Sequence, residues 1–298
     1  MSRAAPAALL LVSFACAPTP EGRSKALLGA LLLDGSGGPP LSNSIVIVED
    51  GRIRAAGAPS AVPVPDDADK VDGSGKVIVP APVDVSDGAH SAALIRAGSP
   101  EEARRAVAAL AARRPTVLYL DETAPETAEA ALDAARAAGI PVLARASTQA
   151  DASFLVDRGA SGLIGIPRGT EDLDAALVAR LRDLRIVVAP ALAASGPSLA
   201  AAERNTLRLF RAGVPIAAAS EGGDLQRELE LLAAAGIPPL DVIVAATRNG
   251  ALALHDPSRG AIEPGKRADL LVLTANPGAD IANLRRIGLR MSGGEWLH

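Results

Sequence analysis

The chain has 298 residues, which is enough to bury one large domain or one large and one small domain. Aromatic residues make up only 2% of it, so the core must consist mainly of small aliphatic side chains, as α/β packing allows. The net charge of −4 creates no basic field, and we therefore expect no nucleic-acid partner.

Residues 1–17 have the pattern of a secretory signal, with Arg3 in a polar start, an apolar run from Ala7 to Ala15, and then small residues. Cys16, the only cysteine, follows the apolar run and resembles the lipidated cysteine of a bacterial lipoprotein signal. Ordinary signal cleavage after Ala17 is a competing interpretation, and a buried cysteine in a short apolar helix is another. We expect an exported protein of the cell envelope, the periplasm or the exterior, anchored to the membrane surface if Cys16 is lipidated.

Residues 18–24 are polar, contain proline and are expected to form a tether. The following residues 25–80 hold short strand-like runs separated by Gly, Asp and Pro, with a hairpin turn at Asp50-Gly51. The C-terminal residues 265–298 have the same texture, so we predict one small composite β-sandwich domain built from both termini. Its strands are expected at Ala26–Leu33, Ser44–Glu49, Arg52–Ala56, Lys76–Val79, Asp269–Leu273 and Arg286–Met291.

Residues 81–264 alternate between short apolar runs and helices with apolar periodicity, which predicts parallel strands joined by crossover helices. Helices are expected at Pro100–Ala112, Glu126–Ala138, Leu173–Leu184, Ala200–Ala212 and Leu225–Ala235. Strands are expected at Val83–Ser86, Thr116–Leu120, Pro141–Ala146, Gly162–Ile166, Ile186–Pro190 and Val214–Ala219. An eight-stranded (β/α) barrel is the natural closed form of this pattern.

The strand count falls short of eight, so we expect an α/β fold with a distorted or incomplete TIM-like barrel. Either Ala92–Arg96 supplies an improvised strand, or the barrel is open on one side. An open side would expose strand edges, which predicts a second copy of the chain or another protein as a cover.

Two pairs of segments carry a family resemblance. The first pair is Leu33–Pro40 followed by Ile45–Ile53, and the second is Ala245–Ala251 followed by Gly260–Leu270. They resemble the opening and closing segments of amidohydrolase-superfamily enzymes, most closely those of the imidazolonepropionase-like branch. The resemblance covers Lys25–Trp296 and implies metal-dependent hydrolysis of C–N bonds, in which one or two divalent ions activate a water molecule.

The resemblance also implies metal-binding histidines at the ends of the barrel strands, and this chain does not have them. It has three histidines in all, and only His90 lies near an expected ligand. The expected ligand positions fall on Ser86, Gly88, Tyr119, Arg145, Gly165 and Glu221. Catalytic zinc usually takes three protein ligands, so we interpret the chain as a degenerate member of the family with no cofactor.

We therefore expect an exported binding or scaffold protein that is catalytically silent and takes a small-molecule ligand at the mouth of the barrel. The candidate pocket residues are Ser86, Asp87, Tyr119, Asp121, Glu122, Arg145, Ser147, Ser220 and Glu221. Arg145 could hold a carboxylate of the ligand. Because buried charges must be paired, we favour the alternative that it pairs with Glu221 or Glu122.

The main alternative is an active hydrolase that cleaves a cyclic amide, an imidazolone or a dipeptide at an altered site. A divalent ion (Zn, Mn or Mg) would then be held mainly by Asp84, Asp87, Glu221 and His90. Glu221 could instead act as a catalytic base without a metal. A third interpretation is a purely structural or interaction module at the membrane surface.

Overall fold

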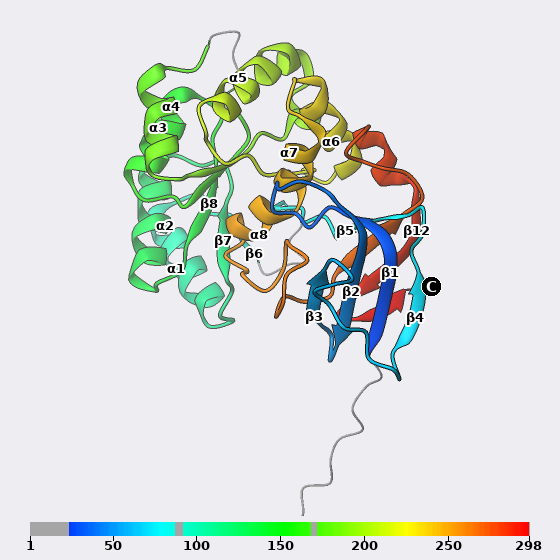
Figure 1. Ribbon diagram of the computed structural model, residues 1–298. Helices are drawn as coiled ribbons and strands as arrows, with labels where there is room; N and C mark the ends of the chain where they lie inside the picture. The colour runs from blue at the N-terminus through cyan, green and yellow to red at the C-terminus, as the bar shows by residue number, and fades with distance from the viewer. Residues whose placement is uncertain (1–23, 87–91, 168–171, 298) are drawn as a thin grey trace, which may run out of the picture.

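The computed structural model describes residues 24–86, 92–167 and 172–297. It consists of two parts that lie side by side, one with parallel strands and most of the helices, the other a mostly antiparallel sheet (Figure 1). The predicted signal with Cys16, and the site candidates Asp87 and His90, lie outside the described residues. Within the described ranges, no helix combines the length and apolar character needed to cross a membrane.

The antiparallel part is one sheet of eight strands to which both ends of the chain contribute. Its order is β13-β12-β11-β5-β1-β2-β3, with β4 paired to β1. The bounds are β1 (Lys25–Leu32), β2 (Leu41–Glu49), β3 (Arg52–Gly57), β4 (Asp69–Asp72), β5 (Val77–Pro80), β11 (Leu270–Leu273), β12 (Ile287–Ser292) and β13 (Glu295–Leu297). The two ends meet where β11 runs antiparallel to β5, with Leu270 opposite Pro80.

The continuous apolar run of β2 is explained by burial of both faces of the strand. Val46 and Val48 pack into one apolar cluster, whereas Ile45 and Ile47 pack into another on the opposite face. The predicted turn at Asp50-Gly51 joins β2 to β3, and both residues have positive φ, as a tight two-residue hairpin requires.

The other part contains a five-stranded parallel sheet in the order β10-β9-β8-β7-β6. Its strands are β6 (Ala92–Ile95), β7 (Val117–Leu120), β8 (Val142–Arg145), β9 (Gly162–Ile164) and β10 (Val187–Ala189). The α-helices are α1 (Pro100–Ala111), α2 (Pro125–Ala137), α3 (Gln149–Asp157), α4 (Ala175–Asp183), α5 (Leu199–Arg211), α6 (Leu225–Ala234), α7 (Pro239–Ala246) and α8 (Arg248–Ala253). Short 3₁₀ helices span Leu192–Ala194, Gly196–Ser198 and Ile281–Arg285.

Both faces of the parallel sheet are buried, as expected for strands that alternate with helices. Leu118 and Ala144 face the large cluster formed with the helices, and α1 to α4 cover this outer side (Figure 1). Val117 and Leu143 belong to a separate inner cluster that also includes Leu254, next to the end of α8. The inner face of the sheet is therefore filled with apolar side chains, and side chains at the carboxyl ends of the strands lie above this packed layer.

A closed eight-stranded barrel is not confirmed, because regular pairing among the described residues stops at five strands. Beyond β10, Val188 forms one bridge with Ile216, and the Val85 N–H donates to the Ala218 oxygen at 3.1 Å. The predicted strands Val83–Ser86 and Val214–Ala219 were thus wrong as regular strands, and Pro215 lacks the N–H that a continuous ladder needs. At the other end, the improvised strand predicted at Ala92–Arg96 is confirmed as β6, which within the described ranges pairs with β7 alone.

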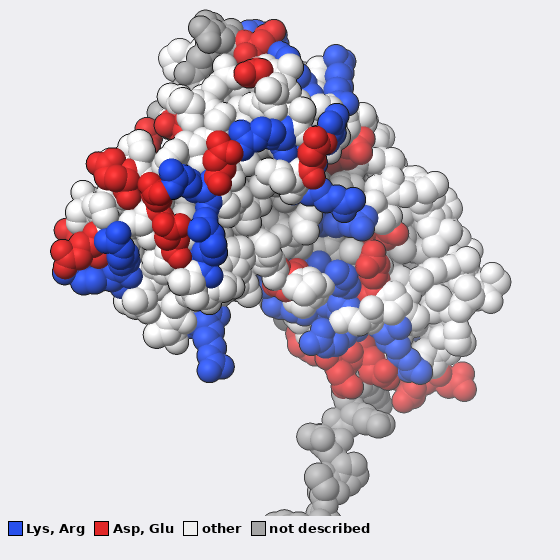
Figure 2. Space-filling view, turned by 90° about the vertical axis from the view of Figure 1, so that its left-hand side faces the viewer, with Lys and Arg blue, Asp and Glu red and all other residues white. Residues whose placement is uncertain are grey.

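Some charged residues on the outer helices pair with neighbours on the same helix, and others pair across to the next helix. On α1, Arg105 lies 3.0 Å from Glu101, and on α2, Arg136 lies 2.8 Å from Asp133. Figure 2 shows charges of both signs interspersed over the face that it draws. Such exposed pairs each contribute roughly 0–1 kcal/mol, so these helices are held mainly by their apolar faces.

Candidate functional site

A cluster of polar side chains lies at the carboxyl ends of the parallel strands, centred on Arg145 at the end of β8. Its Nη2 donates to the Tyr119 hydroxyl at 2.7 Å and forms an ion pair with Glu221. Its Nε donates to Asp121 Oδ1 at 3.2 Å. The Arg145 and Glu221 side chains are only 17% and 11% exposed, so the guanidinium is largely enclosed by groups that neutralise or hydrogen-bond it.

Burial also affects Tyr119, which comes from the middle of β7 and faces the inner cluster. Desolvation raises the pKa of its hydroxyl above the ordinary value, although the nearby Arg145 charge acts in the opposite direction. The hydroxyl is therefore protonated at neutral pH, and it can donate to Glu221 Oε1, 3.4 Å away, while it accepts from Arg145.

A second set of hydrogen bonds fixes the backbone that carries Glu221. The Ser86 hydroxyl donates to Asp84 Oδ1 at 2.7 Å and accepts the Glu221 N–H at 2.8 Å. Asp84 Oδ1 also accepts the Ser220 N–H at 3.1 Å. Glu221 has a φ of 52°, a left-handed conformation that a non-glycine residue adopts only when its surroundings hold it there. The local structure thus aims the Glu221 carboxylate at Arg145.

A cavity of about 320 Å³ opens beside Arg145. Its polar lining comprises Asp121, Glu122, Thr123, Arg145 and Asp151, and Leu120, Phe154 and Leu155 form much of its apolar wall. A second hollow adjoins it and shares Asp121, Glu122 and Thr123. Acidic groups outnumber basic ones in the first cavity, and the only arginine in its lining is already paired.

A buried carboxylate that the sequence did not point out lies behind this cluster. Glu228 on α6 is fully buried and accepts the N–H groups of Leu192 at 2.9 Å and Ala193 at 2.8 Å. Burial raises its pKa to about 7, the two backbone hydrogen bonds oppose that effect, and the charge of Asp84 adds to it. Glu228 thereby positions the turn that follows β10, whose Ala191 has a φ of 54°.

Comparison with known proteins identifies the family. Residues 96–297 match the model of the amidohydrolase family. The chain belongs to this family. No curated protein matches.

Among solved structures, the chain resembles molinate hydrolase (17% identity, TM-score 0.78), with 93% of this chain and 95% of that one covered. It also resembles a candidate prolidase from Bifidobacterium longum (22% identity, TM-score 0.79), with 93% and 95% covered. A. niger ochratoxinase is similar too (17% identity, TM-score 0.77), with 92% and 95% covered. At these identities the similarity shows the fold, and the fold is shared with hydrolases.

The described residues of this amidohydrolase do not fit a catalytic metal. No three His, Cys, Asp or Glu side chains come together anywhere in residues 24–86, 92–167 and 172–297. The carboxylates at the strand ends are already engaged, Asp121 and Glu221 by Arg145 and Asp84 by Ser86 and the Ser220 N–H. Arginine keeps its charge at any ordinary pH, so a cation already stands among these carboxylates.

The structure brings together five of the predicted pocket residues, namely Ser86, Tyr119, Asp121, Arg145 and Glu221. The predicted pairing of Arg145 with Glu221 is confirmed, but its second acid is Asp121, while Glu122 is exposed on the cavity rim. Ser220 contributes only its backbone N–H to the Asp84 contact. The buried hydroxyl of Ser147 makes no hydrogen bond within the described part of the chain.

Proposed function

We propose that this amidohydrolase-family protein is catalytically silent and binds a small molecule at the cavity beside Arg145. The observation that carries the proposal is the ion pair between Arg145 and Glu221, with Asp121 as the second carboxylate. In a metal-dependent relative, acidic side chains at this end of the strands would have to remain available to a cation. Here a permanent cation of the chain itself occupies them.

Electrostatics disfavours a divalent ion next to Arg145 while Arg145 keeps its two carboxylates. At an effective dielectric constant of about 20, a divalent ion about 4 Å from a guanidinium would be repelled by about 8 kcal/mol. Asp121 and Glu221 could serve as metal ligands only by leaving Arg145, and Asp84 only by giving up its own hydrogen bonds. The donor set therefore supports binding without a metal.

The lining of the cavity defines the class of ligand. Arg145 is neutralised by two carboxylates, whereas Glu122 and Asp151 add further negative charge to the lining. A carboxylate ligand held by Arg145 does not fit this charge balance. We propose instead a neutral or cationic small molecule whose apolar part lies on Phe154 and Leu155.

The second candidate is an active hydrolase of C–N bonds with an altered site. It is favoured by the neighbours in fold, which include molinate hydrolase and a candidate prolidase. Membership of the imidazolonepropionase-like branch likewise stays a proposal, supported by the segments Leu33–Ile53 and Ala245–Leu270.

Three further proposals rest on the features of the sequence. The pattern of residues 1–17 supports export, and the position of Cys16 supports a lipid anchor at the membrane surface. One edge of β6 has no partner strand among the described residues, which supports a cover formed by a second copy of the chain or by another protein.

The decisive experiment measures metal content. Protein lacking residues 1–17 is exposed to zinc and manganese, dialysed and analysed for both elements, with Glu221→Ala as the control. We expect well below one equivalent in either protein. One equivalent of metal in the wild-type protein that is lost in Glu221→Ala would refute the proposal that the protein is catalytically silent. It would support an active hydrolase instead.

A matched pair of ligands tests the binding part of the proposal. Benzylamine and benzoate share an aromatic ring but carry opposite charges, so calorimetric titration of each isolates the effect of charge. We expect saturable binding of benzylamine and none of benzoate, with Glu122→Gln weakening the former. Tighter binding of benzoate would show that the guanidinium of Arg145 is available to ligands.

A further inference from the structure

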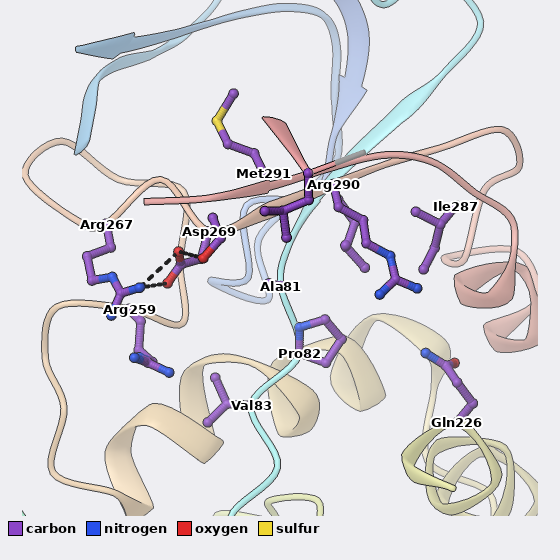
Figure 3. Close-up of a pocket in the computed structure, with 13 residues that line it drawn as sticks. Ala81, Pro82, Val83, Gln226, Arg259, Arg267, Asp269, Ile287, Arg290 and Met291 are labelled. Carbon is purple, nitrogen blue, oxygen red and sulfur yellow. Dashed lines mark hydrogen bonds and ion pairs between the residues drawn. The ribbon is translucent and has the colours of Figure 1, made fainter. Parts of the chain in front are cut away.

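A second cavity of about 320 Å³ lies where the two parts of the molecule meet (Figure 3). Its walls come from Ala81–Val83, which follow β5, from Gln226 at the start of α6, and from strands β11, β12 and β13. The size falls in the range of sites for small ligands, roughly 300–1,000 Å³. None of its lining residues belongs to the cluster around Arg145.

Three arginines line this cavity against a single acidic residue, and two of the arginines are paired. The lining arginines are Arg259, Arg267 and Arg290, and the acid is Asp269. Arg267 lies 3.2 Å from Asp269 Oδ2, and the two side chains meet at one edge of the cavity (Figure 3). Arg259 is 13% exposed and lies 2.8 Å from Asp256.

Asp269 cannot neutralise a further arginine, because its Oδ1 already serves several donors. It accepts the Gly293 N–H at 2.8 Å and the Ser292 hydroxyl at 3.3 Å, as well as Arg267 Nη2 at 3.3 Å. Arg290 on β12 makes no ion pair or side-chain hydrogen bond with the described residues. The lining therefore keeps an excess of positive charge.

The cavity is lined by both hydrogen-bond donors and apolar groups. The Arg290 guanidinium and the Gln226 side chain extend into it from opposite walls (Figure 3). Val83 and Leu271 are buried, Ile287 is half-buried, and all three line the same space. A ligand that matches this lining has a negatively charged head and a short apolar body.

We propose that this cavity binds a small organic anion, with a carboxylate or phosphate held by Arg290. Gln226 donates a further hydrogen bond, while the charges of Arg259 and Arg267 are balanced by Asp256 and Asp269. Guanidinium groups suit this role because their planar donors match the oxygens of both anions and because the charge persists at any ordinary pH. The apolar body of the ligand lies against Ile287 and Leu271.

The experiment uses three ligands at constant ionic strength, the balance being made up with chloride. Calorimetric titration with inorganic phosphate, hexanoate and uncharged hexanamide separates the two anionic heads from the apolar body. The only tryptophan, Trp296, precedes the lining residue Leu297, so its fluorescence gives an independent readout. We expect one saturable site for at least one of the two anions, and much weaker binding of hexanamide.

Two arginine variants locate the site. Arg290→Ala should weaken anion binding at least tenfold, whereas Arg286→Ala removes a nearby exposed arginine that does not line the cavity and should leave binding unchanged. Glu221→Ala should also bind normally, so this test is independent of the cluster at the strand ends. The proposal would be overturned if neither anion bound saturably or if hexanamide bound as tightly as the anions. It would also be overturned if Arg290→Ala and Arg286→Ala lost the same amount of anion affinity.

Discussion

Replacing Glu228 with glutamine should make the protein less sensitive to rising pH. Glu228 is fully buried on α6, and burial raises the pKa of its carboxyl to about 7 from the ordinary value of 4.5. The folded state therefore holds its proton more tightly than the unfolded state. The contribution of Glu228 to the free energy of unfolding is fully present below pH 4.5 and is lost as the pH rises towards about 7.

The difference between the two pKa values sets the size of the effect. Each pH unit between them corresponds to about 1.4 kcal/mol, so the wild type should lose about 3 kcal/mol between pH 4.5 and pH 8 through this group. Glutamine does not ionise, so the Glu228→Gln variant does not lose this part of the free energy of unfolding. At low pH the variant should itself be less stable, because its amide group would face one of the N–H groups of Leu192 and Ala193.

The assay is urea unfolding of both proteins at several pH values between 5 and 8. The informative quantity is the difference in the free energy of unfolding between variant and wild type, which cancels the titration of all other groups. It should shift by about 2.5 kcal/mol in favour of Glu228→Gln over this range. Glu126→Gln, at an exposed position on α2, is the control and should show no shift. A constant difference for Glu228→Gln would mean that the backbone hydrogen bonds to Glu228 outweigh desolvation and that its pKa is not raised in the folded protein.

Two further substitutions probe packing and charge. Arg145→Met should lower the free energy of unfolding by about 2 kcal/mol, because the carboxylates of Asp121 and Glu221 lose their partner. Adding Glu221→Gln to this variant should recover part of the lost stability. Additive losses in the double variant would contradict the pairing. Gly162→Ala should cost about 2 kcal/mol, since its Cβ would lie 2.5 Å from Leu143 Cδ2. Gly98→Ala is the control, because the atom nearest to the added Cβ is an oxygen of a flexible glutamate side chain. Equal urea midpoints for the two alanine variants would refute the tight packing of Gly162 in β9.

The sequence predicts regular elements well where the signal is local. The predicted helix Pro100–Ala112 is found as α1, because Ser99 accepts the Glu102 N–H and proline occupies the first turn. Helix α3 was missed, although Thr148 and Asp151 form a capping box whose spacing is visible in the sequence. With nine residues it offers too short an apolar pattern for periodicity to detect.

Features that depend on tertiary contacts were harder to predict. The sequence predicted that Arg145 lies beside Glu221, but it did not predict Asp121 as the second partner of Arg145. The acids at positions 121 and 122 are adjacent, and the sequence alone does not show which of them follows the end of β7 in the right orientation. Glu228 was missed for a similar reason. Its place in the apolar stripe of α6 is a signal, yet its partners are backbone groups of a distant turn. Closure of the barrel likewise depends on which strands pair, and the alternation of strands and helices does not decide this.

The sheet built from both termini has a consequence for how the chain is made. Lys25 Nζ donates to the Gly294 oxygen at 2.8 Å, across 269 positions of sequence. On the ribosome, β1 to β5 emerge first, but β5 gains its neighbour β11 only after Leu270–Leu273 have been synthesised. Until then an apolar strand edge stays open in the nascent chain, so products that stop before residue 270 should be the ones that aggregate or are degraded.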